Sequence, residues 1–116
     1  MSIKQSAKND PLMPPPVPPW GKIEPEGKTT EVVRFVLADR TVSFRLSEVK
    51  RWEHVAGNPE TLVLKAGKEA VTIEGKELVT IREALDKARL VEVRINANRP
   101  SLQPGPVVRA ITIEPA

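Results

Sequence analysis

Proline placement is the feature of this sequence that most limits how the chain can fold. Twelve of the 116 residues are proline, of which seven fall in 11–25 and four in 100–115, while Pro59 alone lies between 31 and 96. Each proline fixes its own φ and lacks a backbone N–H, so proline-rich segments do not join the middle of a sheet. The two clusters therefore bracket one segment in which strands can pair without interruption.

The first cluster ends in the run from Pro14 to Pro19, which is followed by Trp20. Such a run adopts extended polyproline II and can dock in an aromatic groove of a partner protein. Alternatively, it lies across its own domain or a neighbouring subunit, with Trp20 filling an apolar gap. We favour this second interpretation, because the segment between the clusters has few large apolar residues. Residues 1–10 are typical of disorder, and we expect a Pro-rich, extended or partly disordered arm over 1–30.

Between the proline clusters, apolar residues alternate with polar ones, as they do in half-buried strands. The alternation is clearest in 31–37 and 41–46, which a tight connection joins into a hairpin. Shorter stretches of the same kind predict further strands at 50–55, 62–64, 71–74, 90–96 and 107–113. The strand at 107–113 has apolar residues at both odd and even positions, so we expect other parts of the protein to pack against both of its faces.

After the predicted strand at 71–74, the period of the apolar residues changes from two to 3.6, which predicts one amphipathic helix over 80–89. The expected buried stripe consists of Ile81, Ala84, Leu85 and Ala88. Thr80 and Glu83 have the spacing of a capping box at the start of the helix. We therefore predict one small α+β domain over 31–114, a mostly antiparallel β roll or half-barrel of about seven short strands with the helix packed on it.

The composition leaves few groups for catalysis. The chain has no cysteine and a single histidine, His54, which excludes a disulfide scaffold, a Cys-ligated metal site and a thiol nucleophile. No nucleophile or orienting group near His54 in the sequence completes a catalytic set, so we interpret it as a structural or surface residue. We expect no enzyme activity, no cofactor and no metal site.

The charges suggest nucleic-acid binding as one alternative function. Lys and Arg number 18 against 15 Asp and Glu, a net charge of +3, and no segment is a basic block. The best candidate patch comprises Arg45, Lys50, Arg51, Trp52 and Lys65. On one solvated face these cations could bind phosphates while Trp52 stacks on a base. We favour the simpler interpretation that the charges are ordinary surface residues and Trp52 is core, because stacking surfaces usually present more aromatic side chains.

Apolar residues on faces that should be solvated point to a different function. They are Val32, Val36, Val63, Val108 and Ala110. The Pro-rich arm, the helix or a second copy of the chain could cover them. We expect a non-catalytic protein-interaction or assembly module that binds itself or another protein, with Trp20, Val32, Val36 and Val108 as candidate contact residues.

The sequence also bears on where the chain acts. No stretch approaches the roughly 18 continuous apolar residues that span a bilayer, and residues 1–10 lack the apolar core of a signal peptide. We therefore expect a cytoplasmic location and no membrane partner.

Overall fold

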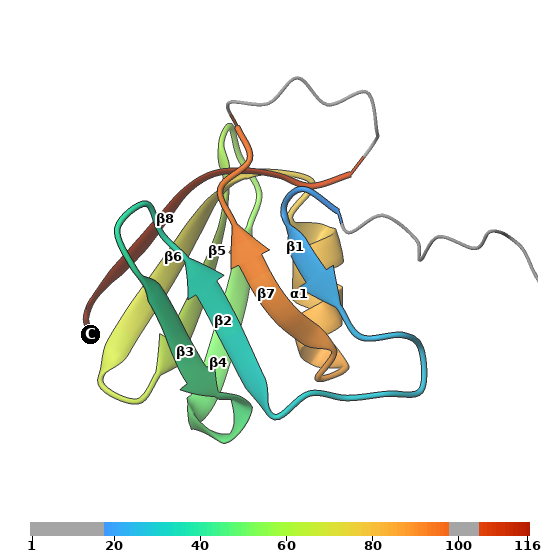
Figure 1. The fold of residues 1–116 in the computed structure, drawn as a ribbon. Helices are drawn as coiled ribbons and strands as arrows, with labels where there is room; N and C mark the ends of the chain where they lie inside the picture. The colour runs from blue at the N-terminus through green and yellow to red at the C-terminus, as the bar shows by residue number, and fades with distance from the viewer. Residues whose placement is uncertain (1–17, 98–104) are drawn as a thin grey trace, which may run out of the picture.

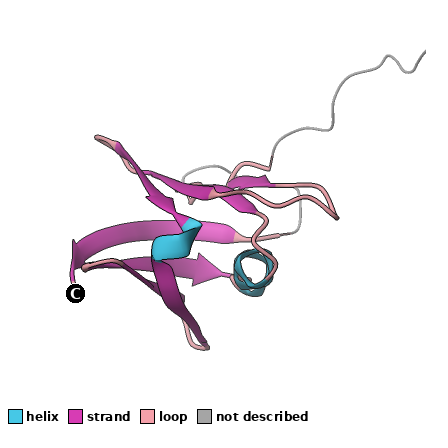
Figure 2. Ribbon diagram, turned by 90° about the horizontal axis from the view of Figure 1, so that it is seen from below, coloured by secondary structure: helices cyan, strands magenta, loops and turns pink. Residues whose placement is uncertain are grey.

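The computed structural model describes residues 18–97 and 105–116. In these residues, eight strands form two four-stranded sheets that lie face to face, with one α-helix, α1 (Val79–Asp86), at their side (Figure 1). Viewed from below, α1 is seen end-on between the two layers and closes one open side (Figure 2). The prediction of a mostly antiparallel β domain with a single α-helix is confirmed. The strands number eight rather than seven, however, and they form two stacked sheets instead of one curled sheet.

Sheet A has the strand order β1-β7-β2-β3, and sheet B has the order β4-β5-β6-β8. Sheet A contains β1 (Gly21–Ile23), β7 (Leu90–Arg94), β2 (Val32–Val36) and β3 (Thr41–Arg45). Sheet B contains β4 (Val49–Val55), β5 (Glu60–Ala66), β6 (Glu69–Lys76) and β8 (Val107–Pro115). A 3-10 helix, η1 (Leu46–Glu48), carries the chain from β3 to β4. Neighbouring strands are antiparallel except β2 and β7, which are parallel.

The core lies between the two sheets, because the period-two alternation puts apolar side chains on one face of each strand. Sheet A buries Val33, Phe35, Phe44 and Val93, and sheet B buries Leu62, Leu64, Val71 and Ile73. The rings of Phe35 and Phe44 meet edge to face, with centroids 6.0 Å apart and planes at 67°. Aliphatic side chains fill most of the remaining space.

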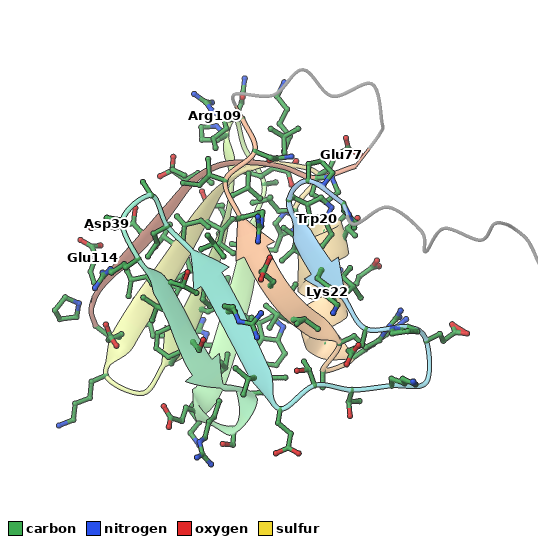
Figure 3. All side chains as sticks on the ribbon, in the orientation of Figure 1. Trp20, Lys22, Asp39, Glu77, Arg109 and Glu114 are labelled. Atoms are coloured by element: carbon green, nitrogen blue, oxygen red, sulfur yellow. The ribbon has the colours of Figure 1, made fainter. Side chains whose placement is uncertain are left out.

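The domain begins before residue 31, because Trp20 and β1 belong to it. Trp20 is 5% exposed and is part of the core cluster. Its carbonyl accepts a hydrogen bond of 2.7 Å from the N–H of Arg94, and β1 continues from there as the antiparallel partner of β7 (Figures 1 and 3). Gly21 makes this approach feasible, since a Cβ at this position would lie 1.9 Å from the carbonyl oxygen of Glu92. The rest of the predicted Pro-rich arm, up to Val17, lies outside the described residues.

A bulge in β8 explains why this strand is apolar on both parities. Ala110 pairs with Glu74 and Val108 pairs with Gly75, so Arg109 is an extra residue in β8. One inserted residue reverses the side-chain alternation beyond it. Val108 is consequently fully buried while Arg109 is exposed. Val108 is therefore covered by the core of its own domain and needs no partner chain to bury it.

Helix α1 begins one residue before the predicted 80–89 segment and ends at Asp86. Its buried residues are Ile81, Ala84 and Leu85, on the side that packs against β4 and β7. The predicted capping box is wrong, because Thr80 lies within the helix and the N-cap residue is Leu78, which has no side-chain cap. The helix stops where Ala88 adopts a φ of 56°, in the left-handed region that commonly follows a helix end.

Replacing the buried indole tests whether Trp20 is an integral part of the domain. We expect Trp20→Ala to lower the free energy of unfolding by about 3–5 kcal/mol, the usual cost of emptying a large aromatic site in a core. Guanidinium chloride unfolding followed by circular dichroism measures the change. Pro18→Ala, at an exposed position nearby, is the control and should leave the midpoint unchanged. An equal midpoint for both variants would contradict the placement of Trp20 in the core.

Candidate interaction surfaces

The single histidine pairs with a carboxylate that also holds the start of α1. Nε2 of His54, on β4, lies 2.8 Å from Oε1 of Glu60, the first residue of β5. Glu60 also accepts hydrogen bonds from the backbone N–H groups of Glu77, at 2.8 Å, and Leu78, at 3.1 Å. The carboxylate therefore binds the two backbone N–H groups that immediately precede α1.

Electrostatics agree with this structural role of Glu60. The hydrogen bond with His54 and that from the N–H of Glu77 keep the pKa of the Glu60 carboxyl below its ordinary value. An ionised carboxylate is the better acceptor for these donors. His54 and Glu60 are each about a quarter exposed, at 22% and 25%, and the carboxylate is engaged with the backbone. The pair thus joins β4, β5 and α1.

The residues predicted to form a nucleic-acid patch are divided between the two sheets. Arg45 ends β3 in sheet A, whereas Lys50, Arg51 and Trp52 lie on β4 and Lys65 on β5 in sheet B. Of these, Arg51 and Lys65 face each other directly across β4 and β5. The structure therefore brings two of the five together on the outer face of sheet B.

Trp52 packs against the core and forms a hydrogen bond to α1. It lies opposite Leu64, a core residue of β5, and is packed against the core cluster. Its indole N–H donates a hydrogen bond of 2.7 Å to Oδ1 of Asp86 at the end of α1. Arg82 binds the other oxygen of the same carboxylate at 2.6 Å. Trp52 therefore anchors α1 to the edge of sheet B.

The predicted contact residues have different surroundings. Trp20 and Val108 are buried in the core, so neither offers its side chain to a partner. Val32 is 37% exposed and Val36 is half-buried, both on the outer face of sheet A. These two valines are accompanied there by charged residues from all four strands of sheet A.

Four basic side chains gather on the outer face of sheet A, which we call the basic face. They are Lys22 on β1, Arg94 on β7, and Arg34 and Arg45 on β2 and β3. Within the four strands, the carboxylate on this face is Glu92, which lies opposite Lys22 on one side and Arg34 on the other. Glu31, just before β2, lines the same hollow as Arg45 at the margin of the face. Sequence analysis could not group these residues, because the parallel pairing of β2 with β7 joins segments 58 positions apart.

Glu92 is the centre of the basic face. Nη1 of Arg34 lies 3.2 Å from its Oε1, and Nε of Arg94 lies 3.0 Å from its Oε2. The Glu92 side chain is 14% exposed, whereas those of Arg34 and Arg94 are 45% and 49% exposed. Burial raises the pKa of the Glu92 carboxyl, but the hydrogen bonds from Arg94 and Arg34 outweigh it, so this pKa lies below its ordinary value. The carboxylate thus holds two guanidinium groups at the surface.

Strand β8 forms one edge of sheet B, and a single residue covers its first part. The N–H of Asn96 donates to the carbonyl of Val108 at 3.0 Å, and the N–H of Val108 donates to Oδ1 of Asn96 at 2.6 Å. Asn96, at 5% exposure, is buried in this position. Beyond Val108, no strand of the described residues pairs with the outer edge of β8.

A shallow hollow of about 430 Å³ opens between the start of β2 and the end of β3. It is lined by Glu31, Val32, Arg45, Leu46 and Ser47. The lining brings together one carboxylate and one guanidinium, so the hollow resembles an ordinary surface depression more than an acid–base site.

Comparisons with protein-family models, curated proteins and solved structures found no match to the chain. Over residues 18–97 and 105–116, no helix is long and apolar enough to cross a membrane. The same residues contain no group of three or more histidine, aspartate and glutamate side chains arranged to hold a metal ion.

Neutralising Glu60 tests its role at the start of α1. We expect Glu60→Gln to lower the free energy of unfolding at pH 7 by about 1–2 kcal/mol, because an amide is a weaker acceptor and also presents donors to the N–H groups. A carboxyl with a lowered pKa stabilises the fold above its ordinary value of 4.5 and loses this contribution as the pH falls through its lowered pKa. The difference between the two proteins should therefore shrink below pH 4.5.

Urea unfolding over a pH series measures this effect. The control is Glu69→Gln, which removes the same charge from an exposed position at the start of β6. A pH-independent difference between wild type and Glu60→Gln, or an equal effect of Glu69→Gln, would contradict the assigned role.

Proposed function

We propose that the chain is a non-catalytic assembly module in which β8 pairs with β8 of a second copy. The observation that carries this proposal is the outer edge of β8 between Ala110 and Glu114, with which no strand of residues 18–97 and 105–116 pairs. An edge strand presents a row of backbone N–H and C=O groups, to which another strand can add. A non-catalytic role is supported by the engagement of His54 and Glu60 with the helix entry.

The four sheet edges differ in how well they are protected. Strand β1 has three residues, and β3 has five with Arg45 at its end. Strand β4 is irregular near Lys50 and lies beside α1. Short, charged, irregular or covered edges resist pairing with another chain. Among the described residues, none of these devices protects β8 from Ala110 to Ile113.

The sequence of β8 suits pairing with a copy of itself. The strand has nine residues, of which Arg109 and Glu114 carry charge, and these two lie at opposite ends of the strand (Figure 3). The bulge and Asn96 bound the free edge on one side, and Pro115 bounds it on the other. The register available to a partner strand is therefore restricted.

An antiparallel pair centred on Thr112 meets these restrictions. A two-fold axis perpendicular to sheet B places Thr112 opposite its own copy and Ile111 opposite Ile113 of the second chain. Inward side chains then meet inward side chains, so the cores of the two copies continue into each other. Thr–Thr pairs across antiparallel strands are favourable. The product is an eight-stranded sheet made of two copies of the four-stranded sheet B.

Blocking the edge with charge tests the proposal. We expect the wild-type chain to sediment at twice the chain mass at micromolar concentration, and the double variant Ala110→Lys with Thr112→Lys to sediment as a monomer. Lysine on an edge strand opposes pairing, and the four introduced charges of two copies would lie close together. Sedimentation equilibrium measures both masses.

The matched control is Thr61→Lys with Val63→Lys on β5. These positions lie in the same cross-strand rows of sheet B, two strands from the edge, and should leave the dimer intact. A monomeric wild type overturns the proposal, as does a dimer that survives the edge substitutions. A chain lacking residues 1–17 is measured in parallel, and dimerisation only after this deletion assigns the edge to the N-terminal segment instead of a second copy.

A further inference from the structure

We infer that the basic face of sheet A binds the phosphate backbone of a nucleic-acid duplex. The inference goes beyond the proposed self-association and does not depend on it, since the two surfaces lie on different sheets. It also differs from the patch predicted from the sequence, with which it shares only Arg45.

The basic face spans all four strands of sheet A. Lys22, Glu92 and Arg34 form one cross-strand row over β1, β7 and β2. Arg45 lies on β3 opposite Val32, two residue pairs from the Arg34–Ser43 pair of the hairpin. Neighbouring strands are about 4.8 Å apart, so the cations extend over roughly 14 Å. A duplex carries one charge per about 1.7 Å of its axis, so this width can meet several phosphates at once.

Glu92 orients the guanidinium groups of Arg34 and Arg94 before an anion binds. Arg34 uses Nη1 to bind the carboxylate, and Arg94 uses Nε and Nη2. The remaining guanidinium N–H groups are oriented before a ligand arrives, on side chains that are nearly half exposed. A guanidinium fixed in this way loses less conformational entropy on binding phosphate than a free side chain.

The opposite outer face lacks this excess of positive charge. On sheet B, Arg51, Lys65 and Lys76 share the outer face with Glu53, Glu74 and Glu114, and Arg109 is exposed at the bulge of β8. Arg51 already pairs with Glu53 at 3.2 Å. The charges on the outer face of sheet B nearly balance, so the attraction for a polyanion is stronger at sheet A.

The uncharged residues of the basic face favour a duplex over other polyanions. They are Val32, Val36, Thr41 and Ser43. Because none is aromatic, a single strand would find no side chain on which to stack its bases. The two valines are also too small to insert into the interfacial region of a lipid bilayer. Contacts confined to phosphates position a duplex without reading its sequence.

The test is the salt dependence of binding to a short DNA duplex of mixed sequence, followed by fluorescence anisotropy. For three or four phosphate contacts, the logarithm of the association constant should fall against the logarithm of salt concentration with a slope of about −3. The variant Lys22→Gln with Arg45→Gln removes two cations without disturbing the Glu92 pairs. It should reduce the magnitude of the slope by about 2 and weaken binding at low salt at least tenfold.

The charge-matched control is Arg51→Gln with Lys65→Gln on the outer face of sheet B, which should retain the wild-type slope and affinity. Equal losses from the two pairs of substitutions, or no salt-dependent binding by the wild type, overturn the inference. So does tighter binding to the single strand than to the duplex, or binding to phosphatidylserine vesicles without binding to the duplex. The oligomeric mass of each variant, measured separately, keeps this outcome distinct from that of self-association.

Discussion

The insertion of β7 between β1 and β2 is the constraint on which the rest of sheet A depends. In sheet A, β7 is the strand that pairs with both β1 and β2. Its antiparallel pairing draws Trp20 into the core, and its parallel pairing sets Glu92 beside Arg34. A parallel pair needs a long crossover, and here the crossover comprises β3, all of sheet B except β8, and α1. Folding of sheet A therefore requires most of the chain to be in place.

The two proposed surfaces use different groups and are geometrically compatible. The proposed self-association would use backbone groups at the edge of β8, whereas the proposed duplex binding would use side chains on the outer face of sheet A. A two-fold axis perpendicular to sheet B leaves both copies of sheet A on the same side of the assembly. Dimerisation would then place two basic faces side by side and increase affinity for a long polyanion by a second attachment.

Sequence periodicity predicted the local elements well where burial follows a simple period. The β2–β3 hairpin and the stripe containing Ile81 and Leu85 lie close to their expected positions. The predictions were wrong at the start of α1 and in β8, where contacts with residues distant in the sequence set the local structure. The helix begins before Thr80, and Glu60 from β5 binds the N–H groups of Glu77 and Leu78 at its entry in place of a local capping box. The bulge at Arg109 likewise gives Val108 an inward position that a strict period of two would deny it.

Proline placement and hydrophobic period act on neighbouring residues, so the order of residues already indicates where strands can form and which face of most strands is apolar. The sequence by itself also determined that cysteine chemistry is absent. Only the tertiary structure decided that the strands divide into two sheets, that β1 joins the domain, and that Lys22, Arg34, Arg45 and Arg94 share one face. These features depend on pairing between segments far apart in the chain, and a local pattern cannot specify the partner of a strand.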